Sequence, residues 1–258
     1  LSIVNNKVIK LSTGAPFIDQ GGVTSDYGGG TITRTEGGYP IQGFYGYVVD
    51  GIFQSQDEVD NLNQKALQQY NEGNVGQRYY QNEFTAPGDI KFKDLNGDGI
   101  VDDNDRKYIG HFMPDFSYGI NFSADYKNFD VSMLIQGVYG NEIYSGTKVL
   151  SQGMMRLFNA DKAVLNAWTP TNKNTTIPRA ISGDPNNNAR TSDRFIEDGS
   201  YLRIKNLTIG YNFPDKVMSS LFRNSMTGLR LYITAQNLLT LTNYYGYDPE
   251  IASHRSST

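Results

Sequence analysis

Residues 116–136, FSYGINFSADYKNFDVSMLIQ, determine how the fold is interpreted. From Phe116 to Tyr126 large apolar side chains alternate with small polar ones without a break. The pattern stops at Lys127-Asn128 and resumes at Phe129, with Leu134 as the one apolar residue out of phase. Because successive side chains of a strand point to opposite sides of a sheet, the stretch predicts a β-hairpin with one apolar face and one polar face.

Two architectures fit a hairpin of this kind. A soluble sandwich buries one face of each sheet and leaves the other wet. A transmembrane β-barrel strand needs about 9–11 alternating residues, with aromatic side chains near both water interfaces. Phe116 and Tyr118 lie at one end of the apolar face, and Tyr126 and Phe129 lie beside the turn. The other face is small and mostly uncharged, as in a wet lumen, and this favours the membrane barrel.

The composition excludes several classes of function. The 258 residues carry a net charge of −4 with no basic stripe, so no nucleic-acid partner is expected. Cysteine is absent and the only histidines are His111 and His254, which disfavours thiol chemistry, thiolate zinc sites and Ser-His-Asp triads. Adjacent acidic residues such as Glu197-Asp198 would face apart on a strand, so we expect no catalytic site and no enzyme. A helical membrane span is excluded because no run of about 18 apolar residues occurs.

The sharpest chemical motif is DLNGDGIVDDND at residues 94–105. It places oxygen ligands in the register of a twelve-residue EF-hand loop, with Gly99 at the sharp turn. The expected ligands of a structural calcium ion are Asp94, Asn96, Asp98, the carbonyl of Ile100, Asp102 and Asp105. Asp105 stands where an EF-hand has Glu, so the loop must close more tightly. The alternative is a solvated Asp/Asn/Gly turn without an ion.

The remaining segments predict loops, helices and a second hairpin. Ser55 and Glu58 form a capping box before a helix that should end near Gly73. A short helix is predicted over 161–168, where Trp168 could stack on a sugar or anchor the core. Strands are predicted within 200–241, and Asn237 breaks their alternation, which indicates a bulge or the membrane edge. The connections alternate between short and long, as in outer-membrane barrels with short periplasmic turns and long extracellular loops.

Several of these segments carry a specific resemblance. The chain resembles the C-terminal region of the SusC/RagA family of TonB-dependent outer-membrane transporters. The resemblance covers nearly the whole chain in order, through residues 39–54, 87–110, 114–144, 165–170, 195–214 and 229–240.

The resemblance implies an all-β fold: part of a 22-stranded antiparallel transmembrane barrel with an N-terminal plug and long extracellular loops that carry short helices. It implies a Gram-negative outer-membrane location, a SusD-like surface lipoprotein as a lid, energy from TonB, and import of oligosaccharides or peptides. A dimer of transporter–lipoprotein pairs is compatible with it. The expected organisation is a strand end (1–11), an extracellular loop region (12–113), a barrel hairpin (114–139), an extracellular loop (140–199), a second hairpin (200–241) and the start of another loop (242–258).

The chain departs from the family pattern in ways that predict a C-terminal portion of a longer protein. It has no plug, no TonB box and no strand after the Tyr-Asp-Pro-Glu segment at 247–250. TonB would therefore act through an N-terminal region outside this chain.

Aromatic residues of the expected loops are the candidates for substrate or lid contact, because aromatic rings can cover the apolar faces of sugars. They are Tyr39, Phe44, Tyr45, Tyr47, Tyr244, Tyr245 and Tyr247. The alternative is that these rings only hold the loops together. The alternative function is a soluble, calcium-stabilised adhesin or glycan-binding module on the cell surface. That module would pack Phe116, Ile120, Ile209 and Ile233 into one dry centre, whereas a barrel would leave them exposed to lipid.

Overall fold

The computed structural model describes residues 1–12, 14–21, 30–155, 159–222 and 228–250. Parts of the three predicted loops (13, 22–29, 156–158 and 251–258) and part of the second predicted hairpin (223–227) thus lie outside the described residues. The strands are β1 (Ser2–Ile3), β2 (Phe17–Gln20), β3 (Thr33–Glu36), β4 (Gly43–Gly46), β5 (Val49–Ile52), β6 (Ile90–Phe92), β7 (Lys107–Gly110), β8 (Phe116–Tyr126), β9 (Phe129–Tyr139), β10 (Glu142–Tyr144), β11 (Ile196–Asp198), β12 (Tyr201–Asn212) and β13 (Arg230–Thr242). The α-helices are α1 (Gln56–Asn71), α2 (Gly146–Gln152) and α3 (Asp215–Phe222).

The chain divides into two compact units. The strand unit comprises Leu1–Asn5, Met113–Glu142 and Asp198–Thr258. The loop unit comprises Asn6–Phe112 and Ile143–Glu197. None of the helices that the structure describes is long and apolar enough to cross a membrane.

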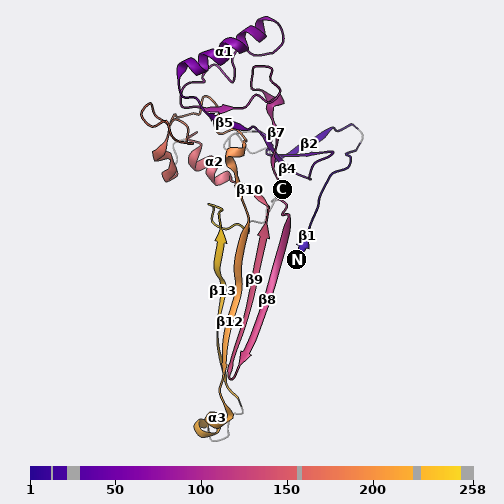
Figure 1. Cartoon of the computed structure of the whole chain (residues 1–258), viewed down its shortest axis with the longest axis vertical. Helices are drawn as coiled ribbons and strands as arrows, with labels where there is room; N and C mark the ends of the chain where they lie inside the picture. The colour runs from indigo at the N-terminus through magenta and orange to yellow at the C-terminus, as the bar shows by residue number, and fades with distance from the viewer. Residues whose placement is uncertain (13, 22–29, 156–158, 223–227, 251–258) are drawn as a thin grey trace. The chain divides into compact units, whose positions relative to one another are not determined.

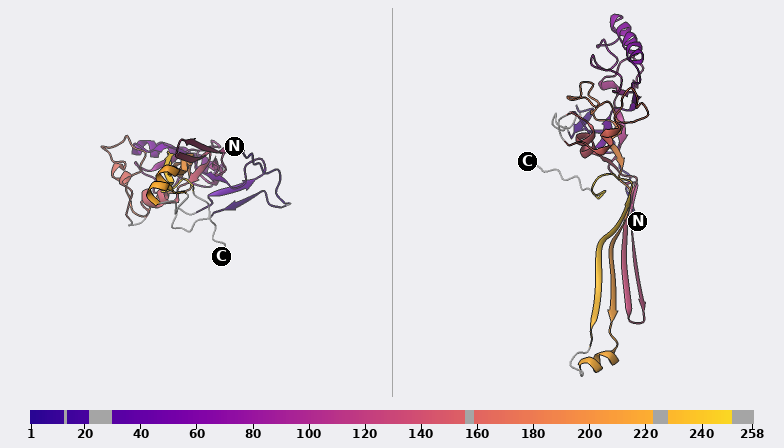
Figure 2. Two further views of the ribbon diagram at one scale, coloured as in Figure 1. Left: turned by 90° about the horizontal axis from the view of Figure 1, so that it is seen from below. Right: turned by 90° about the vertical axis from the view of Figure 1, so that its left-hand side faces the viewer.

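The strand unit is an antiparallel sheet in the order β1-β8-β9-β12-β13 (Figure 1). Its four long strands run side by side in Figure 1 and in the right-hand view of Figure 2. The predicted hairpin is confirmed: Tyr126 pairs with Phe129 across the Lys127-Asn128 turn, where Lys127 has a φ of 56°. The second predicted hairpin, β12–β13, is also present. The strand predicted at 1–11 is reduced to Ser2–Ile3, which pairs with the first two residues of β8.

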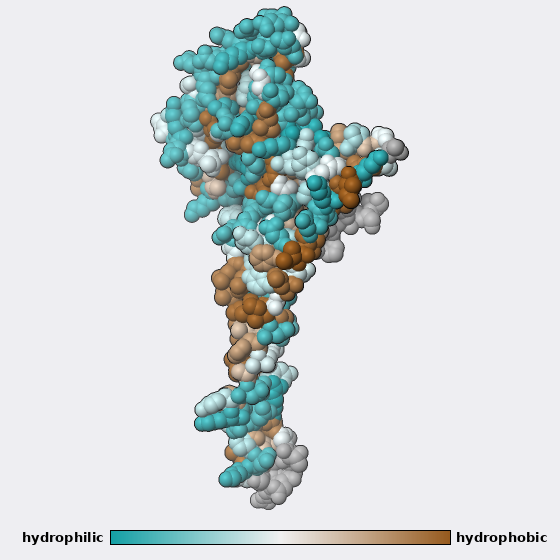
Figure 3. Space-filling view, turned by 45° about the vertical axis from the view of Figure 1, so that its right-hand side comes forward, coloured by the Kyte–Doolittle hydropathy of each residue, from teal (hydrophilic) through white to brown (hydrophobic). Residues whose placement is uncertain are grey.

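The apolar face of this sheet is exposed. Ile120, Ile209 and Ile233 are 54%, 46% and 80% exposed, and Phe116 is half-buried, so the four residues do not form the dry centre that a soluble module would need. Brown, hydrophobic side chains gather on the part formed by the long strands (Figure 3). Aromatic contacts mark both ends of the face: Phe116 stacks on Tyr139 with centroids 5.2 Å apart, and Phe129 lies 4.7 Å from Tyr211. An apolar band between two aromatic ends is typical of a strand surface that faces lipid.

A β-bulge disrupts the pairing of three neighbouring strands, and the number of extra residues increases from β9 to β12 to β13. Ile204 and Asn206 of β12 pair with the consecutive residues Ile135 and Leu134 of β9. Lys205 is therefore extra on β12. The same two residues pair with Leu239 and Gln236 of β13, so two residues of β13, Asn237 and Leu238, lie opposite the single residue Lys205. Asn237 adopts a φ of 50°, a left-handed conformation that Asn tolerates better than most residues. The break in alternation at Asn237 is therefore a β-bulge.

Gly210 of β12 has no side chain, and this allows side chains of the two neighbouring strands to meet above it. Asp130 of β9 and Arg230 of β13 form an ion pair at 2.6 Å on the polar face. A Cβ placed at Gly210, which lies between them, would come within 2.7 Å of both groups. Glycine at this position thus permits an ion pair between strands that are not neighbours.

The loop unit contains the hydrophobic core. One cluster comprises Ile52, Phe53, Val59, Tyr80, Ile90, Phe92, Val101 and Trp168. Trp168 is 8% exposed and its indole N–H donates to Gln54 at 3.0 Å, so it anchors the core. Helix α1 begins after Ser55, whose hydroxyl accepts from the Glu58 N–H at 3.3 Å, as predicted. The Glu58 carboxylate accepts from the Gln54 N–H at 2.9 Å instead of from Ser55, so the predicted box is only half formed.

Two local predictions for this unit were wrong. The region predicted as an extracellular loop over 12–113 contains the antiparallel pair β2–β3, which continues into β4 and β7. Arg34 holds this pair: its guanidinium lies between the rings of Phe17 and Tyr45, at 3.7 and 3.9 Å, and bonds Asp19. These contacts involve residues far apart in the chain, so no local pattern reveals them. The helix predicted over 161–168 is a 3-10 segment at Lys162–Asn166.

Candidate functional site

The Asp-rich loop is closed by its own side chains. The Asp94 carboxylate accepts from the N–H groups of Gly97 at 2.6 Å and Gly99 at 2.9 Å. Asp105 is fully buried and accepts from the N–H groups of Leu95 at 2.7 Å and Asp102 at 2.8 Å. Burial raises the pKa of the Asp105 carboxyl, and these hydrogen bonds offset part of that rise.

The other predicted ligands lie on the same loop but bond to one another. Asn96 donates from Nδ2 to Asp98 at 2.9 Å, and Asp98 accepts from the Ile100 N–H at 3.0 Å. Asp102 caps the 3-10 turn at Asp103–Asp105. Among the described residues, no three His, Cys, Asp or Glu side chains are grouped closely enough to hold a metal ion. The donors have the hard oxygen chemistry that calcium prefers, but they are not gathered around one point.

The predicted contact aromatics of the loop unit pack within it. Phe44 lies in β4 and is only 7% exposed, so its assignment to an exposed loop surface was wrong. Tyr39, at 44% exposure, stacks on Tyr108 with ring centroids 3.9 Å apart. Tyr45 contacts Tyr108 edge-on at 5.3 Å. Tyr47 donates to Asp103 at 3.2 Å, and burial raises its pKa to about 12. These contacts hold the unit together, and Tyr39 is the most exposed of the four rings.

The tyrosines after β13 are arranged differently. Tyr245 and Tyr247 are 74% and 103% exposed. The ring of Tyr244 lies over Gly246, where a Cβ would meet it at 2.3 Å. Two of the three predicted side chains in this segment are therefore presented to the outside of the described strand unit.

An ion cluster that the sequence analysis missed lies next to this segment. Arg203 of β12 is 4% exposed and donates to Thr240 at 2.9 Å, Glu250 at 2.8 Å and Asp248 at 2.6 Å. Lys205 adds a bond to Glu250 at 2.7 Å. The available signal was the pair of basic residues two positions apart in a strand that otherwise carries no charge.

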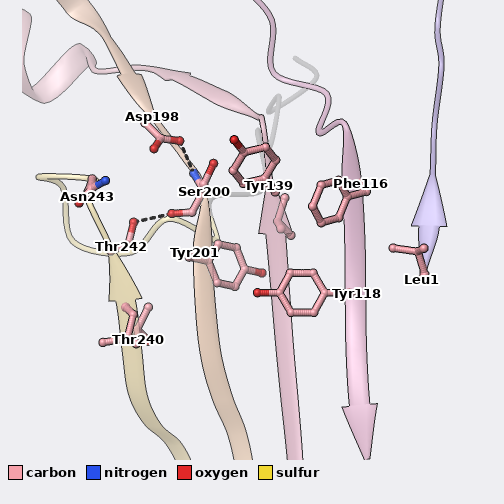
Figure 4. Close-up of a pocket in the computed structure, with 12 residues that line it drawn as sticks. Leu1, Phe116, Tyr118, Tyr139, Asp198, Ser200, Tyr201, Thr240, Thr242 and Asn243 are labelled. Carbon is pink, nitrogen blue, oxygen red and sulfur yellow. Dashed lines mark hydrogen bonds between the residues drawn. The ribbon is translucent and has the colours of Figure 1, made fainter.

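A cavity of about 940 Å³ opens at the end of the long strands (Figure 4). Phe116, Tyr118, Tyr139 and Leu241 supply apolar lining, and the Tyr118 ring lies over Gly137. The Ser200 N–H donates to Asp198 at 2.9 Å, and the Thr242 hydroxyl donates to the Ser200 carbonyl at 2.8 Å. The lining residues include no Lys, Arg or His, so the cavity provides no cationic site for an anion.

No protein-family model matches the chain. Several curated proteins, by contrast, are similar to it in sequence. The chain is 37% identical over 220 residues to TonB-dependent receptor P3 of Formosa agariphila, covering 85% of this chain and 19% of the relative. It is 31% identical over 258 residues to TonB-dependent receptor P26 of the same organism, covering 97% of this chain and 23% of the relative. It is 27% identical over 214 residues to TonB-dependent receptor SusC of Bacteroides thetaiotaomicron, covering 79% of this chain and 20% of the relative.

A solved structure has the same fold. The structure of the RagAB peptide transporter aligns with a TM-score of 0.67 and 23% sequence identity, covering 94% of this chain and 23% of that chain. The chain spans about a fifth of the length of the curated relatives that it matches. Those relatives are receptors, in agreement with the prediction that the chain is not an enzyme. The sheet with an exposed apolar face, the fold match and these relatives together identify the chain as a segment of a TonB-dependent receptor of the SusC/RagA type.

Proposed function

We propose that the protein containing this segment imports oligosaccharides or peptides across the outer membrane. In this proposal the apolar face of β8, β9, β12 and β13 faces the bilayer and the polar face lines the lumen. The residues of the loop unit are extracellular and contact a SusD-like lipoprotein lid. TonB supplies energy through a region outside this chain, and two transporter–lipoprotein pairs form a dimer.

The exposed apolar face is the observation that carries the proposal. A side-chain surface as exposed as that of Ile120 and Ile233 costs free energy in water and is stabilised by lipid. The opposite face bears hydroxyl and amide groups that bond to one another, as between Thr208 and Thr234 at 3.0 Å. A sheet that is apolar outside and polar inside is what a wet barrel wall requires.

Uptake by cells tests this proposal. Cells that make the full-length protein with its lipoprotein are given a fluorescent malto-oligosaccharide in one arm and a fluorescent peptide in the other. We expect one probe to accumulate only when both the protein and a functional TonB are present. Uptake of neither probe, or uptake that persists without TonB, would contradict import. Full-length protein that stays monodisperse in water without detergent would favour the soluble module instead.

We also propose a structural calcium ion on the loop at residues 94–105. The support is the ligand register and the turn at Gly97 and Gly99, both with positive φ, of 77° and 91°. Binding would require Asp94 to release the N–H groups of Gly97 and Gly99, and Asn96 and Asp98 to release each other. These oxygens would then join the Ile100 carbonyl, Asp102 and Asp105 around the ion.

The double substitution Asp94→Ala, Asp98→Ala is expected to remove bound calcium and speed amide exchange across residues 86–110. Elemental analysis and hydrogen exchange of the full-length protein measure the two effects. The matched control is Asp57→Ala, Asp60→Ala, which removes two acidic side chains from α1 outside the loop. Equal calcium content in the double variant and in the unaltered protein would refute the ion.

A further inference from the structure

The segment after β13 is docked onto the polar face of the sheet by the ion cluster at Arg203. Arg203 pairs across the ladder with Thr240 of β13 and with Gln136 of β9, which places it on the polar face. Its guanidinium reaches Asp248 and Glu250, 45 and 47 positions further along the chain. The chain therefore turns back after Thr242 and returns along the polar face instead of leaving the sheet.

We call the ion cluster of Arg203, Lys205, Asp248 and Glu250 the latch, because it holds the segment after β13 on the sheet. Two cations, Arg203 and Lys205, face two carboxylates, Asp248 and Glu250, so the group is neutral as a whole. Asp248 also accepts from the Glu250 N–H at 2.8 Å, which tightens the Asp-Pro-Glu turn. The planar guanidinium binds two acids and one hydroxyl at once, a geometry that Lys does not reproduce. Lys205 lies at the bulge, and both of its bonds to Glu250 are on the same side as Arg203.

Docking of this turn determines where the exposed tyrosines lie. Tyr245 and Tyr247 sit directly before the Asp248–Glu250 turn, and the Tyr244 ring over Gly246 restricts the other side. Rings that are exposed but held by their backbone lose little conformational freedom on binding, so they contact a ligand at low entropic cost. On the polar face, the molecule they would meet is the cargo in the lumen and not lipid.

We propose that Arg203 is a positioning residue: it docks the Asp248-Pro249-Glu250 turn onto the polar face and thereby presents Tyr245 and Tyr247 to the cargo. The assignment of this face to the lumen rests on the proposed import function. The Arg203 guanidinium also holds the pKa of the Asp248 carboxyl below its usual value, which favours the charged form of this carboxyl.

Hydrogen exchange of the full-length protein in detergent tests the latch. Arg203→Met is expected to speed amide exchange in residues 244–250 by about tenfold, which corresponds to about 1.4 kcal/mol of lost protection. Arg203→Lys should retain more protection than Arg203→Met, because Lys keeps the positive charge but lacks the planar guanidinium that binds both acids. Asp248→Asn, Glu250→Gln should reproduce Arg203→Met, with no further effect when combined with it. The matched control is Arg230→Met, which removes the other Arg–Asp pair of the same sheet and should leave residues 244–250 unchanged.

Two results would overturn the latch: unchanged exchange in Arg203→Met, or equal loosening in Arg230→Met, which would indicate general weakening of the sheet. Uptake of the transported probe tests presentation. Arg203→Met and Tyr245→Ala, Tyr247→Ala should lower it to a similar extent and non-additively. Loosened exchange with unchanged uptake would overturn the presentation of the tyrosines. If neither probe is imported by the unaltered protein, the import function fails, while the exchange data still decide the latch.

Discussion

Ile120→Arg is expected to prevent stable assembly in the membrane, whereas Asn121→Arg, one residue further along the same strand, is expected to be tolerated. Ile120 lies midway between the two aromatic ends of the apolar face and is 54% exposed. An Arg on the lipid face near the middle of a bilayer costs about 2–4 kcal/mol. Asn121 lies on the polar face, where an Arg stays in contact with water.

The pair of variants separates a lipid-facing surface from a mere defect in strand pairing. Both substitutions place the same side chain on β8, and both residues pair with β9, Ile120 with Ile135 and Asn121 with Leu134. Urea unfolding in lipid and the heat-dependent gel mobility of the full-length protein report assembly. If Asn121→Arg were the more damaging change, the faces would be assigned the wrong way round. Equal effects would argue against a lipid-facing side.

Asp89→Ala is expected to destabilise the loop unit by about 3–5 kcal/mol, because it leaves a charge without its buried partner. Asp89 is fully buried and accepts from Arg179 at 2.8 and 2.9 Å, from Asn188 at 3.1 Å and from the Ala86 N–H at 2.9 Å. It therefore joins the chain before β6 to residues 90 and 99 positions later.

The single tryptophan gives a direct readout of this change, because Trp168 lies in the core cluster of the same unit. Its fluorescence through a denaturant titration should show a lower midpoint for Asp89→Ala. The control is Asp50→Ala. This change removes an ion pair of 3.0 Å between Asp50 and Lys91, in which the Asp50 side chain is 46% exposed. A pair of that kind contributes about 0–1 kcal/mol. Similar midpoints for the two variants would contradict a special role for the buried pair.

The elements that the sequence predicted correctly are those with local causes. Alternation over 116–126 and the polar pair after it identify the hairpin, because side-chain direction in a strand depends only on position. Ser55 identifies the start of α1 because a helix end needs an acceptor within three residues. The irregularity at Asn237 was visible for the same reason, since a bulge changes the phase of one strand.

The ion pairs that join distant segments of each unit were not predictable from local patterns, which do not identify the partner of a charged residue. Arg34 with Asp19, Asp89 with Arg179 and Arg203 with Asp248 join residues that are 15, 90 and 45 positions apart. Phe44 has the same aromatic character as Tyr45, and only its packing in β4 shows that it is buried. The partner of each charged residue depends on which strands pair and in what register, and one amino-acid composition is compatible with many such pairings.

The sequence by itself determined that this chain forms hairpins with one apolar and one polar face, since alternation is a property of each strand alone. Only the tertiary structure decided where the apolar face points, because a sandwich and a barrel wall share the same alternation. The structure places the buried core in the loop unit and leaves Ile120, Ile209 and Ile233 exposed. The physical reason is that burial depends on contacts between segments, and the sequence of one strand does not specify which segment or solvent will cover its face.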